Sequence, residues 1–319
     1  MTRWFGLVLA LVLGAAGTTR AEDYPARAVR IIVPWAAGGV ADIAARALAD
    51  DMRDDLGQAV VVDNRPGASG KIGTQAVQHA VPDGYTLLLA VPSGQTLPTV
   101  IDKNLGYDPV ADFKPIAQLS SSTYFLVVRP SLAVTSAAEL VAYARANPNK
   151  LSYGSIGTGS STHLAGAMLA SAAKIDIVHV PYKGEAPVVQ DMLSGQLDIA
   201  FVIDARAHVA AGKVRVLGTT APEPWFTLPD VPSLGATLPG FKFLAWQGLM
   251  APAGTPDAVA AKLNAAVNKS VAGGRLAGIL TQQGFKPVGG APAVLARTIE
   301  DDLRTVRQAV ADAHLTFDN

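Results

Sequence analysis

Short apolar runs alternate with stretches of helical period along the first third of the chain. Val29 to Val33 is an apolar run that predicts a buried strand. From Ala41 to Leu56 small and apolar residues recur at every fourth position, and Gly57 then predicts the end of a helix. The same reasoning predicts a strand, a helix and a further strand at Ala59 to Asp63, Ile72 to Ala80 and Tyr85 to Ala90. Strands that alternate with helices indicate a parallel sheet covered on both faces.

A second set of alternating elements begins near Leu151. Its predicted strands and helices are, in chain order, Leu151 to Gly154, Thr162 to Ala173, Ile177 to Val180, Ala186 to Leu193, Leu197 to Ile203 and Val214 to Thr219. Extended runs at Phe113 to Pro130 and Phe241 to Ala251 join the two sets. The chain is therefore expected to cross between them twice, on two hinge strands.

The C-terminal third has the pattern of helices. Thr255 is expected to be the N-cap of a helix that begins at Pro256 and runs to about Val271, and the last helix is expected at Pro292 to His314. We therefore predict an α/β fold with two doubly wound domains and a cleft between them. The expected domains are residues 22–124 together with 248–319, and residues 125–247.

The first 21 residues have the pattern of a secretory signal peptide rather than of a folded element. Arg3 is followed by an apolar run of about 13 residues, short of the roughly 20 that cross a bilayer. Thr19-Arg20-Ala21 ends in the small residue that signal peptidases need, so cleavage is expected after about Ala21. No cysteine is present, which excludes a disulfide scaffold, a thiolate zinc site and a lipid-modified cysteine. We expect a soluble periplasmic protein without a lipid anchor.

Composition and charge exclude several classes of function. The chain has 26 basic and 26 acidic residues, and neither Lys nor Arg forms a cluster. A nucleic-acid partner is therefore not expected. The five histidines do not pair at metal-ligand spacing, so no metal site is expected.

Each set of elements opens with a strand, a loop of small residues and a helix. The first loop lies within Val33 to Asp42 and the second within Tyr153 to Thr162. Both follow the carboxyl end of a predicted parallel strand, where open α/β sheets bind ligands. A helix N-terminus offers unpaired N–H groups and a partial positive charge, and glycine lets a ligand approach the backbone. Two such ends that face one cleft would hold a carboxylate; the alternative is that each loop is only a tight turn.

Ordered motifs along the chain resemble those of one known family. They are Tyr24-Pro25 with Ile31 to Asp42, Asn64 to Ala68, Pro82 to Leu88, Tyr107 to Pro109, Tyr153 to Leu164, His179 to Gly184, Leu228 to Pro232 and Ala251 to Pro256. They cover essentially the whole mature chain, which is similar to the Bug family, the extracytoplasmic solute receptors of tripartite tricarboxylate transporters. The resemblance implies a two-lobed periplasmic-binding-protein fold, type II-like, that closes on a small carboxylate and delivers it to a membrane permease.

The resemblance also implies which ligands and residues take part. Family ligands are di- and tricarboxylates, acidic amino acids and aromatic carboxylates. The family's ligand loops fall on Pro34 to Asp42, on Ser155 to His163 and near Ser93. The candidate ligand-binding residues are Trp35, Ala37, Gly38, Gly39, Asp42, Ser93, Ser155, Gly157, Thr158, Gly159, Ser160, Ser161, Thr162, His163 and Asp204. No catalytic residue and no cofactor is implied, and we expect a monomer.

Several assignments stay open at this stage. Trp35 replaces the family's usual Phe with a wider ring in the expected apolar wall of the cleft. The segments Val91 to Pro98 and Val202 to Arg206 depart from the family pattern, which leaves open the specificity for the distal end of the ligand. Asp42 is a helix cap or a ligand contact, and His163 is a carboxylate donor or a packing residue.

Further side chains leave similar choices. Arg206 meets a second carboxylate or forms a salt bridge. Lys183 and Arg65 lie in turns and are expected to be structural.

Other functions fit the residues less well. A hydrolase would need a nucleophile elbow of the Gly-x-Ser-x-Gly kind, and none is present. A nucleotide enzyme would need a Gly-x-Gly-x-x-G or a P-loop pattern, and the two loops match neither. A sensor that docks on a membrane histidine kinase would use the same ligand chemistry as a transport receptor.

Overall fold

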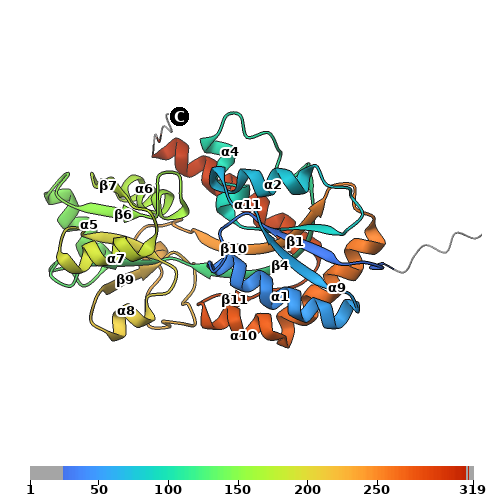
Figure 1. Cartoon of the computed structure of the whole chain (residues 1–319). Helices are drawn as coiled ribbons and strands as arrows, with labels where there is room; N and C mark the ends of the chain where they lie inside the picture. Colours follow the sequence, from blue (N-terminus) through green and yellow to red (C-terminus); the bar gives the residue numbers. More distant parts are fainter. Residues whose placement is uncertain (1–23, 314, 316–319) are drawn as a thin grey trace, which may run out of the picture.

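The computed structural model describes residues 24–313 and 315, which fold into two lobes, each built around one sheet (Figure 1). The strands of the first lobe are β1 (Val29–Val33), β2 (Val60–Asn64), β3 (Thr86–Ala90), β4 (Phe113–Thr123), β10 (Leu244–Pro252) and β11 (Lys286–Pro287). Those of the second lobe are β5 (Phe125–Val128), β6 (Ser152–Ser155), β7 (Val178–Pro181), β8 (Ile199–Val202) and β9 (Arg215–Thr219). The α/β fold in two lobes is confirmed.

Helices flank both sheets. The first lobe has α1 (Val40–Leu56), the short 3-10 turn η1 (Ala68–Gly70), α2 (Lys71–Gln78), α3 (Pro92–Gln95), α4 (Pro98–Ile101), α9 (Asp257–Gly273), α10 (Arg275–Gln282) and α11 (Pro292–Asp312). The second has α5 (Ala137–Ala146), α6 (Ser161–Ala173), α7 (Glu185–Ser194), α8 (Arg206–Ala210) and the 3-10 turn η2 (Leu234–Ala236). Within residues 24–313, no helix has the length and apolar composition needed to cross a membrane.

Both sheets are mixed rather than purely parallel. In the first lobe the order is β11-β4-β10-β3-β1-β2, and β1 runs parallel to β2 and β3, whereas β10 runs antiparallel to β3 and β4. In the second lobe the order is β7-β6-β8-β5-β9, and β5 is antiparallel to both of its neighbours. The expectation of parallel sheets is therefore wrong at these strands. The reason is topological, because a strand that arrives from the other lobe enters its new sheet from the opposite end.

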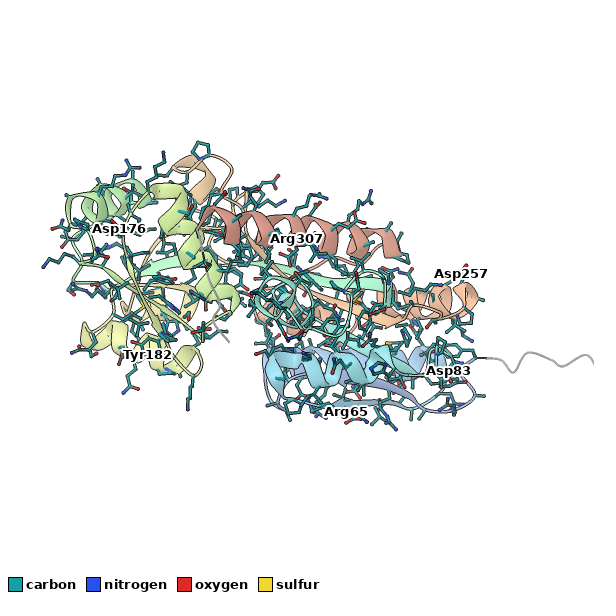
Figure 2. All side chains as sticks on the ribbon, turned by 90° about the horizontal axis from the view of Figure 1, so that it is seen from above. Arg65, Asp83, Asp176, Tyr182, Asp257 and Arg307 are labelled. Atoms are coloured by element: carbon teal, nitrogen blue, oxygen red, sulfur yellow. The ribbon has the colours of Figure 1, made fainter. Side chains whose placement is uncertain are left out.

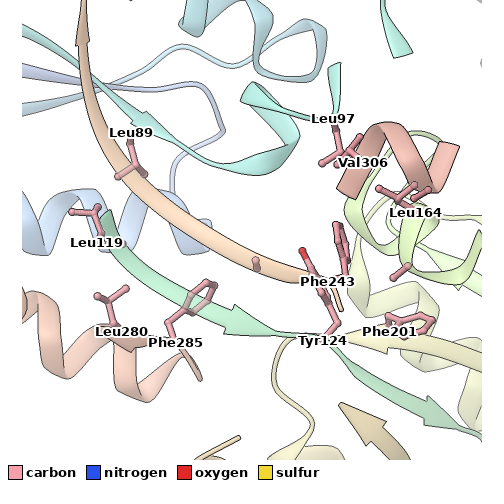
Figure 3. Close-up of a cluster of buried hydrophobic side chains, with 14 of the residues drawn as sticks. Leu89, Leu97, Leu119, Tyr124, Leu164, Phe201, Phe243, Leu280, Phe285 and Val306 are labelled. Atoms are coloured by element: carbon pink, nitrogen blue, oxygen red, sulfur yellow. The ribbon is translucent and has the colours of Figure 1, made fainter. Parts of the chain in front are cut away.

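The chain crosses between the lobes from β4 to β5 and again before β10. At the two crossings, Tyr124 and Phe243 stack with ring centroids 5.4 Å apart and ring planes 14° apart. Figure 3 shows this pair between Leu119 and Phe285 of the first lobe and Phe201 of the second. One apolar cluster thus continues from one lobe into the other. The predicted domain boundaries near residues 124 and 247 stay a prediction.

The longest helix, α11, links the lobes on one side. Figure 2 shows it, labelled at Arg307, extending from the first lobe to the second. At its end the Ser171 hydroxyl of α6 donates a hydrogen bond of 3.0 Å to the carbonyl oxygen of Asp312. The predicted range for this helix ended at His314, which lies outside the described residues, as does the predicted signal peptide.

One predicted helix cap is wrong. The N-cap of α9 is Pro256 rather than Thr255, and the helix begins at Asp257. The Thr255 hydroxyl instead donates to the carbonyl oxygen of Pro252 at 2.8 Å, and the backbone N–H of Thr255 bonds to the same oxygen at 3.0 Å. Thr255 therefore closes the turn before the helix.

Candidate ligand-binding site at the two glycine loops

The first glycine loop, residues 34–39, connects β1 to α1 and is largely exposed. Gly39 is the N-cap of α1 in an extended conformation, and no side chain caps the helix from this position. Gly38 has a φ of 84°, in the left-handed region that glycine tolerates best. Ala37, Gly38 and Gly39 are all exposed, so the start of α1 is open to an incoming ligand.

Asp42, in the first turn of α1, holds the first loop in place. One oxygen of its buried carboxylate accepts hydrogen bonds of 2.9 Å from the Gly38 N–H and the Arg46 Nε, and the other accepts one of 2.9 Å from the Asn64 amide. Burial alone would raise the pKa of Asp42, but the hydrogen bonds and the charge of Arg46 outweigh it and lower the pKa below its usual value. These contacts tie Asp42 to the loop before the helix and to β2.

Trp35 lies between the first loop and the segment that contains Ser93. A Cβ added at Gly70 would lie 3.1 Å from Trp35 Cζ2, and one added at Gly94 would lie 3.8 Å from the same atom. Trp35 is half-buried, and its indole Nε1 is buried without an acceptor among the described residues. Trp35 and the half-buried Ser93, a neighbour of Gly94 on α3, therefore lie on the same side of the first lobe, beside the first loop.

The second glycine loop, residues 156–160, connects β6 to α6 and is more enclosed. Ser160 is the N-cap of α6, and its hydroxyl accepts a bond of 3.3 Å from the His163 N–H and donates one of 2.6 Å to the Gly157 carbonyl. Gly157 and Gly159 have φ values of 135° and 76°, which side chains with a Cβ rarely adopt. The loop is thus closed on itself by its own cap.

The backbone donors of the second loop bond largely within the protein. The N–H of Ile156 bonds to Thr162 Oγ1 at 3.0 Å, that of Gly157 to Ser155 Oγ at 3.2 Å, that of Gly159 to His163 Nδ1 at 3.0 Å and that of Ser160 to the Gly157 carbonyl at 3.1 Å. Of the main-chain donors expected at the two loops, these four and that of Gly38 are therefore already occupied. The N–H groups of Ser161 and Thr162 remain, because the first turn of a helix offers them no acceptor within the helix.

Two stacked imidazoles lie behind the second loop. The rings of His163, on α6, and His179, on β7, have centroids 3.9 Å apart and planes 10° apart. Burial lowers the pKa of His163, and burial together with the charge of His163 lowers the pKa of His179 to about 4. His163 is 7% exposed, and its Nδ1 already accepts the Gly159 N–H. These two observations fit a packing role better than that of a direct carboxylate donor.

The second loop also touches the first lobe. A Cβ added at Gly159 would lie 2.8 Å from Ile101 Cδ1 of α4. The cavity left at this seam is only about 10 Å³ and is lined mainly by aliphatic side chains of α4, α6 and α11. A hollow of this size is at the lower limit for one water molecule, so the seam is a packed contact between the lobes.

Asp204 and Arg206 form a second contact between the lobes. Arg206 pairs with Asp204 at 2.7 Å and donates a hydrogen bond of 2.7 Å to the Gln282 carbonyl of α10. The charge of Asp204 is therefore already paired, and the pair reaches the first lobe. Arg65 pairs with Asp63 at 3.0 Å.

Sequence reasoning missed several residues that shape the loops. Arg46 and Asn64 hold Asp42, His179 stacks on His163, and Ile101 packs on Gly159. The spacing of Asp42 and Arg46, four positions apart on one helix, was a signal that could have revealed the first pair. The other partners come from distant elements, and no local pattern indicates them.

Known proteins resemble this chain over most of its length. A family model described as the tripartite tricarboxylate transporter family receptor matches residues 44–315. The structure of Rpa4515 of R. palustris with adipate superposes with a TM-score of 0.80 at 32% identity and covers 92% of this chain and 99% of its own. MatC of Rhodopseudomonas palustris with bound malate gives 0.75 at 32%, covering 90% and 100%. The periplasmic binding protein BugD gives 0.76 at 33%, covering 91% and 99%.

These similarities confirm the resemblance to the Bug family. Because the family and its structural neighbours are solute-binding receptors, they also confirm that the chain is not an enzyme. The chain belongs to the receptor family of the tripartite tricarboxylate transporters and has the fold of a periplasmic solute-binding protein.

Proposed function

We propose that the protein captures a small organic carboxylate between its lobes and delivers it to the membrane permease of a tripartite tricarboxylate transporter. The observation that carries the proposal is the pair of helix N-termini, α1 in the first lobe and α6 in the second, each preceded by a glycine loop. Similar receptors have been solved with adipate and with malate.

The charges around the first loop favour this ligand class. A carboxylate such as Asp42 beside an anion site would normally repel the ligand. Here the Asp42 carboxylate already accepts hydrogen bonds from Gly38, Arg46 and Asn64, and the Arg46 guanidinium balances its charge. The partial positive charge at the start of α1 therefore stays available for an incoming anion.

The second loop contributes neutral donors to the proposed site. The backbone N–H groups of Ser161 and Thr162 lie in the first turn of α6, beside the exposed Thr158. Hydrogen bonds to a charged group are worth about 1.5–3 kcal/mol each, so four or five divided between the lobes would contribute about 6–15 kcal/mol before ordering costs. A micromolar complex needs roughly 8 kcal/mol, which lies within this range. Bridging waters would extend the reach of these donors.

The proposed site keeps the residue set expected from the sequence, with different roles. Trp35 and Ser93 form the wall beside the first loop, the two glycine loops surround the carboxylate, and His163 and Asp42 hold the loops from behind. Asp204 is proposed to act through its pairing with Arg206 at the contact between the lobes. The lobes, residues 22–124 with 248–319 and residues 125–247, are proposed to close by bending at the two crossings.

A melting-shift screen of the mature chain, residues 22–319, tests the ligand class. The panel contains adipate, L-malate, citrate, L-glutamate and nicotinate, with adipamide as the uncharged match for adipate. At millimolar ligand and micromolar Kd the expected stabilisation is about 4 kcal/mol, and adipamide should give none. Stabilisation by sugars or amines in the absence of any effect of organic acids would contradict the proposal.

Delivery, cellular location and oligomeric state form the second part of the proposal. We propose a periplasmic monomer. Light scattering of the purified chain tests the monomer, and fractionation of expressing cells tests the location. Uptake of the identified acid should fall to background when the receptor is deleted and return when it is supplied again. A normal uptake rate without the receptor would contradict the transport role.

A further inference from the structure

The stacked pair His163 and His179 lies directly behind the second glycine loop. Tyr153 of β6 adds a third ring, with its centroid 4.9 Å from that of His179. The Tyr153 hydroxyl also donates a bond of 3.4 Å to the His163 carbonyl. The three rings pack against one another directly behind the loop.

Each imidazole holds a different part of the loop. His163 Nδ1 accepts the N–H of Gly159 at 3.0 Å, so this nitrogen carries no proton and the neutral ring carries its proton on Nε2. His179 Nε2 lies 2.7 Å from Ser155 Oγ. The Ser155 hydroxyl donates to the Gly157 carbonyl at 3.0 Å and accepts the Gly157 N–H at 3.2 Å, which makes His179 Nε2 the donor to Ser155. Through these bonds the pair holds the backbone of Gly157 and Gly159 at their positive φ values.

We propose that His163 and His179 are positioning residues, which hold the second glycine loop in its ligand-binding shape only while His163 is neutral. The inference rests on the proposed function, because the shaped loop is the half of the carboxylate site that the second lobe supplies. Neither imidazole contacts the ligand in this account. A protonated His163 has a hydrogen on Nδ1 and can no longer accept the Gly159 N–H. Gly159 would then lose its acceptor beside the contact with Ile101.

The surroundings keep the pair neutral. Two imidazolium ions with ring centroids 3.9 Å apart would repel each other, and burial lowers the pKa of both rings. Burial also raises the pKa of Tyr153, which therefore stays uncharged. The side facing α4 and α11 is apolar, with Leu97, Ile101, Val306 and Val310. Among residues 24–313 and 315, the charged groups that line the hollow shared with both rings are Lys174, Asp176 and Asp312.

The first test uses the full mature chain without ligand and reads the imidazole and glycine signals by NMR. We expect the Nε2–H tautomer for His163, and Gly157 and Gly159 amide signals that shift together with the His163 titration below pH 6.5. His163→Asn places an uncharged acceptor near Nδ1, so it should remove the titration and change amide exchange at Gly159 less than threefold. His163→Leu removes the acceptor and should speed that exchange at least tenfold.

The second test measures adipate binding by calorimetry at pH 7.5 and at one pH unit below the midpoint of the His163 titration found by NMR. Between the higher and the lower pH, the wild-type affinity for adipate should fall at least fivefold more than that of His163→Asn. Protonation of adipate itself affects both proteins equally, so it does not contribute to this difference. His179→Gln, which keeps a donor near Nε2, should bind within threefold of wild type at pH 7.5, and His179→Leu should bind at least tenfold more weakly.

Three results would overturn the inference. They are an Nδ1–H tautomer at His163, a Gly159 amide that is indifferent to pH, and equal behaviour of His163→Asn and His163→Leu. If adipate binds neither the wild type nor any variant, the proposed ligand class is contradicted. The NMR comparison still tests the role of the histidine pair, because it uses no ligand.

Discussion

The two glycine loops have the same place in their lobes and are stabilised by opposite means. The first is exposed and is held by a charged network in which Asp42 bonds to Gly38, Arg46 and Asn64. The second is held by neutral groups, the hydroxyls of Ser155, Ser160 and Thr162 and the imidazoles of His163 and His179. An enclosed loop beside an anion site cannot include an unbalanced carboxylate without repelling the ligand, whereas an exposed loop can pair one with an arginine.

The largest effect should come from placing a charge at the cap of the second loop. Asp is a good N-cap, so Ser160→Asp should leave α6 folded and cost roughly 100-fold in acid binding, equivalent to about 2.7 kcal/mol. Ser160→Asn is the matched control, because it caps equally well without charge, and it should cost less than tenfold. Calorimetry measures both variants. Equal losses in the two would mean that the carboxylate does not approach this helix.

A smaller effect, on stability, should come from Gly159. Ala at this position meets Ile101 Cδ1 at 2.8 Å and must adopt a φ of 76°. We expect a loss of about 2 kcal/mol in the free energy of unfolding, which lowers Tm by roughly 3 °C. The counterpart in the first loop is Gly39→Ala, which meets only the Ala36 oxygen at 3.6 Å and should change Tm by less than 1 °C. Equal shifts would remove the distinction between a packed and an open loop.

The charged network of the first loop should contribute less, because Arg46 is about half exposed. Asp42→Asn should lower stability by about 1 kcal/mol at pH 7. Because the folded-state pKa of Asp42 is lowered, its contribution is complete above the unfolded pKa of about 4 and disappears as the pH falls through the folded value. The difference between wild type and Asp42→Asn should therefore shrink below about pH 4. Thermal unfolding from pH 7 to pH 3 measures it, and a constant difference would contradict the account.

The smallest effect should come from Asp204. Its carboxylate is paired with Arg206 at the contact between the lobes, so Asp204→Asn should change acid binding by less than about threefold. Asp204→Leu is a second variant that removes the pairing altogether, and it should stay within about fivefold. If Asp204→Asn weakened acid binding more than tenfold, Asp204 would instead have to contact the ligand directly.

Much of the fold could be predicted because the pattern is local. Apolar strands such as Val29 to Val33 and the helix that ends at Gly57 follow from periodicity and from a left-handed glycine. Helix α5 was overlooked although Ser136 and Glu139 have the spacing of a capping box, and Ser136 does cap it by accepting the Glu139 N–H at 3.2 Å. Strand direction could not be predicted in this way, because it depends on how the chain returns from the other lobe.

The location of both loops could be predicted, but their hydrogen bonds could not. Glycines after a buried strand indicate where the backbone turns, as Gly157 and Gly159 do. The acceptors are groups beside each loop, such as Asp42 and His163. Side chains from other elements hold these in turn: the Asn64 amide of β2 donates to Asp42, and His179 of β7 stacks on His163. The main-chain donors expected at the two loops were therefore already occupied at Gly38 and at four positions of the second loop.

Amide chemical-shift mapping during titration with adipate, and with adipamide as control, tests most directly whether both helix starts hold one acid. The account predicts that the amides of Val40 and Ala41 in the first lobe shift in parallel with those of Ser161 and Thr162 in the second, with one common Kd, and that adipamide leaves them unchanged. Shifts confined to one lobe, or equal shifts with the uncharged amide, would contradict it.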